Sequence, residues 1–402
     1  MAKYELRIET SELKKALDVL VTTINRKNAL PILADVRIGY NRNTKLFSLL
    51  GSNTEQWMEI DAVKAEGAEP WMFLDADDKA TPFSAVCINA AALKEAFSAL
   101  PSCPVVVKID MEKHQMRVDY NTGHFEMPVD AADEFPMPAT FGDTKVQFTM
   151  PTQQLLPLIS AARCCVGTNE LRPIMSTVCI DVFHDHCVVV ASNGHTLYRR
   201  GIDTGMGWLT QAAFAADKNM NLLLPMPALS PVIKALSGSE KIQVTADDSH
   251  IWLQTEGITV GTVTPVGNFP NYDSVIPRDA NSAKVILDKA ELAIALRRVN
   301  IFSSESSNMV IMSRDDNHML LAADDVDFGR AATETVAIIN EDTTLPDNFK
   351  IGCKIADLLE LLQCVGTDNV RISLTDPSKP ILLFEDDDKS SLTLLIMPML
   401  VN

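Results

Sequence analysis

The sequence lacks the segments that place a protein in a membrane or export it. No stretch of its 402 residues approaches the roughly 20 consecutive apolar residues of a membrane-spanning helix, since the longest candidate, residues 394–401, is too short. Residues 1–6 lack the apolar core of a signal peptide. The eight cysteines have no regular spacing, which is typical of reduced cytosolic thiols. We therefore expect a cytoplasmic protein that does not bind a membrane.

Familiar catalytic motifs are also missing. The sequence contains no Gly-x-x-x-x-Gly-Lys-Ser/Thr loop, no His-Glu-x-x-His and no Gly-x-Ser-x-Gly. The run His184-Asp185-His186-Cys187 has metal-ligand residue types, but Asp favours turns and neighbouring strand residues point to opposite faces. It is expected to be a hairpin tip between strands 178–182 and 187–191. No metal site and no cofactor is predicted.

Positive charge is scarce. Thirty-five Lys and Arg residues stand against 53 Asp and Glu residues, so the formal net charge is −18. This excludes a simple basic nucleic-acid binder, whose whole surface attracts phosphate, although it leaves room for a local basic face. With 47% hydrophobic residues the chain can build ordinary cores, so extensive disorder is excluded.

What the sequence does contain is a repeat. Three segments about 140 residues apart pair a short strand with an amphipathic helix, at 4–9 with 11–24, 145–150 with 152–165, and 284–287 with 289–299. A second strand–helix–strand passage follows in each, with helices at 90–100, 228–236 and 355–364. Val-, Ile- and Thr-rich runs between them predict antiparallel strands. The fold class is therefore α+β, in three repeated domains, 1–143, 144–281 and 282–402, each with two helices.

Charge is unevenly divided within this repeat. The six predicted helical segments carry a net +4, which leaves −22 for the rest of the chain. The helices are therefore mildly basic and the sheets strongly acidic. Such a division suggests one face that accepts an anion and an opposite face that repels it. Prolines 157 and 231 fall inside two of the helices, so these helices are expected to start late or to kink.

Short motifs give the repeat a family resemblance. They are Leu30-Pro31-Ile32-Leu33, the run 191–197 (Ala-Ser-Asn-Gly-His-Thr-Leu), Phe269-Pro270-Asn271-Tyr272, and the ending Met397-Pro398-Met399. With these motifs the chain resembles the bacterial sliding clamps, the beta subunits of DNA polymerase III, along its whole length. An apparent insertion at 67–82 and the tail Leu400-Val401-Asn402 depart from the family pattern.

The resemblance implies a head-to-tail homodimer of three-domain arcs that closes into a ring around duplex DNA. Helices would line the hole and antiparallel sheet would form the outer wall. It further implies a non-catalytic processivity factor whose partners are double-stranded DNA, the DNA polymerase III alpha subunit, the clamp loader complex and other proteins with a clamp-binding motif.

The resemblance also implies a peptide-binding pocket between the second and third domains. Carried over residue by residue, it comprises Met175, Ser192, Gly194, His195, Thr196, Leu197, Pro270, Val275, Leu395, Ile396, Met397, Pro398 and Met399. Met-rich apolar surfaces adapt to several partner side chains. Ser192 and Ser274 stand where the family often has Thr and Arg, and Lys354 and Asp357 at the outer edge are atypical, so partner affinities are expected to differ from the family norm.

Two further sets of residues follow from the resemblance and the charge pattern. The DNA-facing set is Lys14, Lys15, Arg26, Lys27, Lys94, Arg163, Arg172, Lys234, Arg297 and Arg298. The dimer interface is expected to join Phe125 and Met127 to Ile301 and Phe302. Without the resemblance, these four apolar residues could equally be ordinary core.

Two other functions stay open at this point. One is an enzyme with its site at a domain junction, around His195 and Asp324-Asp325, although the missing motifs argue against it. The other is a non-catalytic, repeat-built interaction scaffold that never meets DNA. Turnover by the purified protein would support the first, and retention on circular DNA separates the scaffold from a clamp.

Overall fold

The computed structural model describes residues 3–24, 30–41, 46–61, 72–75, 85–138, 142–169, 171–277, 282–341, 345–346 and 349–401. Arg26, Lys27, Asn402 and most of the segment 67–82 lie outside these residues. The chain forms two compact units, which are described separately. The first contains residues 1–156, 209–213 and 227–264, and the second contains 157–208, 214–226 and 265–402. The three domain boundaries predicted above stay a prediction.

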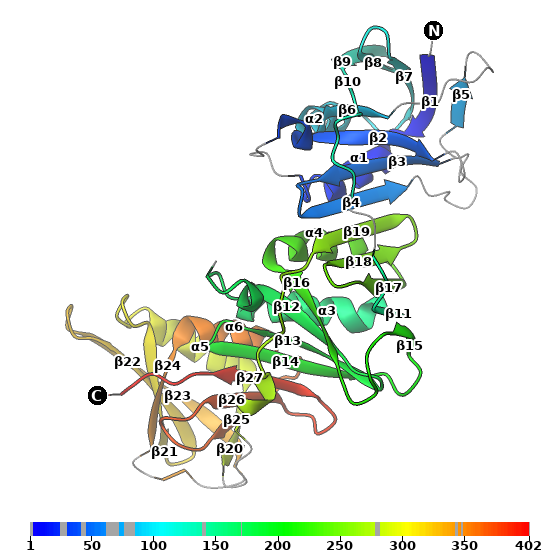
Figure 1. Ribbon diagram of the computed structural model, residues 1–402. Coiled ribbons are helices and arrows are strands. Elements are labelled where there is room, and N and C mark those ends of the chain that lie inside the picture. Colours follow the sequence, from blue (N-terminus) through cyan, green and yellow to red (C-terminus); the bar gives the residue numbers. More distant parts are fainter. Residues whose placement is uncertain are drawn as a thin grey trace. The chain divides into compact units, whose positions relative to one another are not determined.

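Two antiparallel sheets build the first unit (Figure 1). In its described part, one sheet has the order β5 (Met72–Asp75), β1 (Lys3–Glu9), β7 (Pro104–Asp110), β8 (Gln115–Tyr120), β9 (Gly123–Pro128). The other has the order β10 (Asp130–Ala131), β6 (Val86–Asn89), β2 (Asp35–Asn41), β3 (Leu46–Ser52), β4 (Gln56–Asp61), β19 (Ile258–Val263), β18 (His250–Thr255), β17 (Lys241–Ala246), β11 (Val146–Pro151), β15 (Leu209–Ala212).

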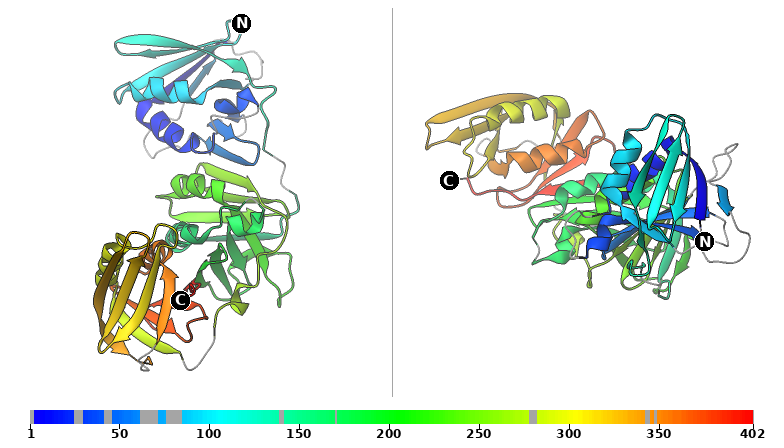
Figure 2. Two further views of the ribbon diagram at one scale, coloured as in Figure 1. Left: turned by 90° about the vertical axis from the view of Figure 1, so that its left-hand side faces the viewer. Right: turned by 90° about the horizontal axis from the view of Figure 1, so that it is seen from above.

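The helical segments of the first unit include α1 (Thr10–Leu20), α2 (Ala90–Ser98) and most of α4 (Met226–Leu236). Two of them, α1 and α2, pack together against these sheets. Helix α1 contacts α2 and strands of both sheets, as Figure 2 shows. Its residues Leu13, Leu17 and Leu20 recur at helical spacing and are buried, as the sequence predicts. A short 3-10 turn, η1 (Pro31–Ala34), leads into β2.

One long antiparallel sheet dominates the second unit. Its described strands run in the order β16 (Met220–Pro225), β12 (Thr177–Val182), β13 (His186–Ser192), β14 (Thr196–Asp203), β27 (Leu392–Ile396), β26 (Ile381–Glu385), β25 (Asn369–Leu374), β20 (Ala283–Asp288), β23 (Arg330–Glu341), β22 (His318–Asp325), β21 (Met309–Asp315), β24 (Lys350–Lys354). The helical segments are the end of α3 (Thr152–Ala162), α5 (Lys289–Asn300), α6 (Ile355–Gln363), and the 3-10 turns η2 (Arg163–Cys165), η3 (Pro173–Ser176) and η4 (Tyr272–Ser274).

All six predicted helices are present, but four end earlier than expected: α1 and α3 by three or more residues, α2 at Ser98 instead of residue 100, and α6 at Gln363 instead of residue 364. Helix α1 was predicted to reach residue 24 and ends at Leu20. The following residues Val21, Thr22 and Thr23 are β-branched, and the hydroxyl of Thr22 donates to the carbonyl of Val19, which favours a turn over another helical residue. Helix α3 ends at Ala162 and continues as the 3-10 turn η2.

The prolines do not delay their helices. Helix α3 begins at Thr152 as predicted, and α4 begins at Met226, two residues earlier than expected. Pro157 and Pro231 are each the sixth residue of their helix. The expectation of a late start was therefore wrong: the helix continues although each proline removes one backbone donor.

Two strand junctions repeat one another. In the first unit β4 pairs with β19, and in the second unit β14 pairs with β27, both antiparallel. Each junction joins the sheet of one repeat to the last strand of the next repeat. The matching pairs, each second from one end of its ladder, are Trp57 with Gly261 and Leu197 with Leu395. The chain therefore makes the same edge-to-edge joint twice.

The cores next to the two junctions also correspond. In the first unit Leu50, Trp57 and Phe135 form a buried cluster with Ile32 packed against it. In the second unit Val190, Leu197 and Phe269 occupy the matching places, with Ile174 packed against them. The internal repeat seen in the sequence is thus a repeat of side-chain packing.

Candidate functional site

A tight turn between β13 and β14 presents His195. The side-chain oxygen of Asn193 accepts the backbone N–H groups of His195 and Thr196, each at 2.8 Å. Gly194 has a φ of +91°, a conformation that favours glycine. The hydroxyl of Ser192 donates to the Thr196 carbonyl at 2.8 Å and closes the turn. His195 is exposed at the tip of this turn.

The same turn occurs in the first unit. Asn53 Oδ1 accepts the N–H groups of Glu55 and Gln56 at 3.2 and 2.8 Å. The hydroxyl of Ser52 donates to the Gln56 carbonyl at 3.2 Å. Thr54 holds the place of Gly194 with a φ of +79°, which is strained for a β-branched residue. Of these two turns, only the one that carries His195 has a glycine at the position with positive φ.

The C-terminal segment runs beside this turn. The N–H of Met397 donates to the carbonyl of His195 at 2.7 Å, and the N–H of Met399 donates to the carbonyl of Gly352 at 2.8 Å. Gly352 leaves room for this contact, because an added Cβ would lie within 3.1 Å of Met309, Val401 and the Met399 carbonyl and would force these neighbours to shift. The methionines of the tail are therefore fixed at the edge of β14 and β24, with Met397 40% exposed.

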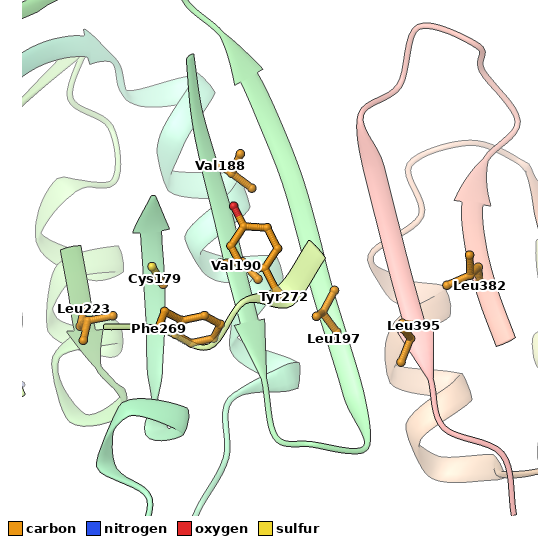
Figure 3. Packing of buried hydrophobic residues seen from close by; sticks show 9 residues of the cluster. All are labelled: Cys179, Val188, Val190, Leu197, Leu223, Phe269, Tyr272, Leu382 and Leu395. Carbon is orange, nitrogen blue, oxygen red and sulfur yellow. The ribbon is translucent and has the colours of Figure 1, made fainter. Parts of the chain in front are cut away.

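The segment 269–276 is the third part of the candidate site, beside the His195 turn and the C-terminal segment. Phe269 and Tyr272 are buried against β12 and β13, and they hold this segment across the strands (Figure 3). The Tyr272 hydroxyl donates to Asp181 Oδ2 at 2.8 Å, and the Phe269 N–H donates to Asn221 Oδ1 at 2.9 Å. Val275 at the end of the segment is 52% exposed.

Asp181 is the buried centre of this anchor. Its other oxygen accepts from Asn221 at 2.9 Å and from Asn219 at 2.5 Å. Burial raises the pKa of Asp181, and the three donated hydrogen bonds oppose the rise. Sequence reasoning missed this network. The available signal was a single acidic residue in the otherwise apolar strand 178–182.

The predicted pocket residues divide by exposure into three groups, all in the second unit. Gly194, His195, Pro270, Val275 and Met397 are exposed. Met175, Ser192, Pro398 and Met399 are half-buried. Thr196, Leu197, Leu395 and Ile396 are buried, and Figure 3 shows Leu197 and Leu395 on the neighbouring strands β14 and β27. We call the first two groups the partner surface, which rests on the third.

Polar residues at the margin of the partner surface form hydrogen bonds or ion pairs with nearby residues. Ser274 is exposed, and its hydroxyl donates to the Asn271 carbonyl at 2.7 Å. Lys354 pairs with Asp357 at 3.5 Å, one turn along the start of α6. Asp273 beside Ser274 pairs with Arg199 of β14 at 3.4 Å.

In the first unit, two of the predicted DNA-facing lysines contact Asp18 of α1. Lys94 of α2 pairs with its carboxylate at 2.7 Å, and Lys234 of α4 donates to its backbone carbonyl at 2.6 Å. Lys14 donates to the carbonyl of Leu100, while Lys15 pairs with Glu12 at 3.2 Å. Two lysines from separate repeats thus lie together at the end of one helix.

In the second unit, Arg163, Arg172 and Arg297 are exposed on η2, before η3 and on α5. Arg298 differs, because its guanidinium makes two 2.7 Å hydrogen bonds to the Glu334 carboxylate of β23. This pairing lowers the pKa of Glu334 and offsets the charge of Arg298. Arg298 is therefore less available to an anion than the exposed Arg163, Arg172 and Arg297.

The four predicted interface residues are not ordinary core. Phe125 and Met127 are half-buried on β9, an outer strand of its sheet among the described residues. The ring of Phe125 packs edge-on against Phe97 of α2 at 5.7 Å. Ile301 and Phe302 follow α5 directly and are 67% and 38% exposed.

The alternative site residues do not assemble into catalytic machinery. Asp325 is buried and pairs with Arg330 at 2.7 Å, while His195 lies at a different turn of the same unit. The run 184–187 is the predicted hairpin tip, where Val182 pairs with Cys187. Among the described residues no three His, Cys, Asp or Glu side chains are grouped to hold a metal ion, and no helix of that part is long and apolar enough to cross a bilayer.

Comparison with known families decides what this arrangement is. The family profile "DNA polymerase III beta subunit, N-terminal domain" matches residues 4–139, and "DNA polymerase III beta subunit, C-terminal domain" matches 273–400. The chain belongs to the DNA polymerase III beta subunit family. Members of this sliding-clamp family are non-catalytic processivity factors, and the resemblance found in the sequence is confirmed.

Individual relatives agree along the full length. The beta sliding clamp of Pseudomonas aeruginosa is 22% identical over 393 residues, which is 98% of each chain, and that of Bacillus subtilis is 20% identical over 395 residues, 97% of this chain and 98% of the relative. The crystal structure of the DNA polymerase sliding clamp from Bacillus subtilis covers both chains fully with a TM-score of 0.85 at 19% identity. The predicted sliding-clamp fold is therefore confirmed.

Proposed function

We propose that two copies of this chain close into a ring around duplex DNA and tether the replicative DNA polymerase, so that synthesis becomes processive. The observation that carries the proposal is the repeated strand junction. A chain of three repeats has three places for such a joint, and two of them are made within the chain. The third requires a second copy.

The strands left for the third joint can be identified by register. Ser52 pairs with Trp57, Ser192 with Leu197, and Asp325 with Arg330, each across the hairpin that ends in β4, β14 or β23. Arg330 on β23 therefore corresponds to Trp57 and Leu197, which pair with Gly261 and Leu395 in the two existing joints. Among the described strands, β23 has no neighbour on this side over residues 331–337.

The opposite strand follows in the same way. We start at the residue five positions before a helix begins and follow the cross-strand pairs from one strand to the next. The path that starts before α3 ends at Gly261, and the path that starts before α5 ends at Leu395. The same path, started five residues before α1, leads to Glu126 of β9. A third joint of identical register sets Glu126 of one copy opposite Arg330 of the other, and Phe125 opposite Ala331.

Helix ends support this joint. Counted from the start of its helix, Ile301 corresponds to Cys164, and the Cys164 sulfur lies 3.5 Å from that of Cys364 at the end of α6. If the third joint repeats this contact, Ile301 of one copy lies against the end of α2 in the second copy, close to Phe97 and Phe125. The exposed apolar residues would then be buried, as Leu394 and Tyr198 are in the β14–β27 joint.

The chemistry of the third joint differs from the other two. The row across β14 and β27 at this register is Leu197 and Leu395, whereas the matching row of the proposed joint contains Arg117, Glu126 and the second copy's Arg330. Exposed charge pairs are weak and screened by salt. A ring that opens for loading should open here, at the charged joint, rather than at the apolar ones.

DNA would be held without a tight grip. The net charge of −18 makes strong open-surface binding implausible, because affinity for DNA rests on many Lys and Arg contacts to phosphate. The helices offer a few cations, Lys14, Lys94, Lys234 and Arg297 among them, which suffice to accept a duplex. Arg26 and Lys27 belong to the same proposal.

The partner surface would hold a short peptide from the polymerase alpha subunit, the clamp loader or other clamp-binding proteins. Its half-buried Met175 and Met399 supply adaptable apolar contacts. Exposed backbone and His195 supply polar ones, since a few placed polar groups fix a ligand's orientation. The cytoplasm, where replication proteins act in bacteria, is the proposed location.

Solution mass tests the proposal most simply. Light scattering at micromolar concentration should give twice the 44.1 kDa of one chain. A chain that remains monomeric at that concentration would count against the ring, whereas a dimer that is lost on charge reversal at Glu126 would support the proposed register.

A further inference from the structure

Three thiols lie together in the second unit, where α3 and α6 end. The sulfur of Cys164 in η2 is 3.5 Å from that of Cys364, the residue that caps α6. It is 3.7 Å from the sulfur of its neighbour Cys165. Cys164 and Cys364 are half-buried, while Cys165 is buried. The sequence showed only the adjacent pair, because 200 residues separate Cys164 from Cys364.

We propose that Cys164 and Cys364 are a site of reversible disulfide formation that covalently joins the two sides of the β14–β27 joint. Sulfurs in contact need only a small side-chain rotation to reach the bond length of about 2.05 Å. The competing bond between Cys164 and Cys165 is disfavoured, because adjacent Cα atoms are about 3.8 Å apart and disulfides usually span about 4.4–6.8 Å.

The surroundings favour Cys164 as the attacking sulfur. Hydrogen bonds from the thiols of Cys165 and Cys364 lower the pKa of Cys164, and the thiolate is the reactive form of cysteine. Its half-buried position leaves access for a small oxidant. Cys165 and Cys364 have pKa values above the ordinary range, first because the thiol of each donates a hydrogen bond to Cys164, and second because burial disfavours their charged forms.

The chemistry balances with glutathione disulfide as oxidant. The Cys164 thiolate attacks one sulfur of glutathione disulfide, forming a mixed disulfide and releasing one glutathione thiolate. Cys364 loses its proton and attacks the Cys164 sulfur, releasing the second glutathione. Two protein thiols are thereby oxidised, and one glutathione disulfide is reduced to two glutathione molecules. Excess reduced thiol reverses both steps.

The cross-link would act on the joint that carries the partner surface. Cys165 lies beside Thr196 of β14, and Gly167 just after it donates its N–H to the Met175 carbonyl at 2.8 Å. Helix α6 contacts β27, which leads into Met397. A bond between Cys164 and Cys364 therefore ties together the two sides of this surface.

The test uses the full-length protein with glutathione disulfide alone. Free-thiol titration should show the loss of two of the eight thiols, and intact mass should fall by two hydrogens. Proteolysis after alkylation should yield one peptide pair linking 164 to 364. On a non-reducing gel the closed 200-residue loop should migrate faster, and dithiothreitol should restore the original band.

Variants sharpen the result. Cys103→Ser, at a half-exposed cysteine of the first unit, should oxidise as the wild type does. Cys164→Ser and Cys364→Ser should not form the loop. A 164–165 link, or a glutathione adduct that persists on Cys164, would overturn the proposal even if both variants failed to fold, since peptide mapping needs only the wild type. DNA retention is a separate assay, so failure here leaves the clamp function untouched.

Discussion

Truncation of the two exposed residues after α5 should open the ring. Ile301 is 67% exposed and Phe302 is 38% exposed in the single chain. Full burial of such a side chain is worth about 1.5–3 kcal/mol, so covering the exposed fractions is worth about 1–2 kcal/mol for Ile301 and about 0.6–1.1 kcal/mol for Phe302. With two joints per ring, the variant Ile301→Ala/Phe302→Ala should weaken the dimer by about 3–6 kcal/mol, roughly a hundred- to ten-thousand-fold in dissociation constant.

Sedimentation equilibrium over a dilution series measures that constant directly. Met206→Ala is the matched control, because Met206 is 79% exposed but lies on the loop between β14 and β15 and belongs to neither β9 nor β23. Thermal unfolding of each variant at low concentration reports the stability of the single chain. Dissociation constants that agree within a factor of three between double variant and wild type would refute burial of these residues in the joint.

Three other expectations follow from the same geometry. A double-mutant cycle with Glu126→Ala and Arg330→Ala should show a favourable coupling of about 0.4–2 kcal/mol for the two pairs of a ring, at about 0.2–1 kcal/mol per cross-strand pair. The coupling should fade between low and high salt, and zero coupling at low salt would reject the register. A peptide with a Gln and two hydrophobic residues should bind the partner surface, and His195→Ala, Met399→Ala or deletion of 397–402 should weaken it when measured by fluorescence anisotropy. Unchanged affinity in all three would reject that surface. Tyr272→Phe removes one hydrogen bond to buried Asp181, so unfolding should become easier by about 1–3 kcal/mol and peptide affinity should fall; calorimetry and anisotropy that both match wild type would show that this anchor does not position the segment 269–276.

Periodic apolar patterns predicted most of the fold. Leu292, Leu296 and Val299 recur at helical spacing and are buried in α5, which also has the side chain of Asp288 as its cap. Strand positions followed from β-branched runs in the same way. Helix ends were less accurate, because the turn after Leu20 depends on local competition by a Thr hydroxyl, which periodicity does not contain.

Long-range polar and sulfur contacts could not be predicted. The Asp181 anchor joins residues 40 and 91 positions apart, and Cys164 meets Cys364 across 200 positions. Such contacts depend on the order of strands in the sheet, which a single sequence does not specify. The Glu126–Arg330 relation likewise emerged only from the cross-strand register, although both residues are visible in the sequence.

Retention on DNA of defined topology tests the central claim most directly. The protein is loaded onto nicked circular duplex DNA by an ATP-driven clamp loader, washed in high salt, and the circle is then cut once. A ring held by closure should survive the salt, because its hold does not rest on phosphate contacts, and should slide off after the cut. Protein that remains on the linear DNA and leaves when the salt is raised would contradict the account.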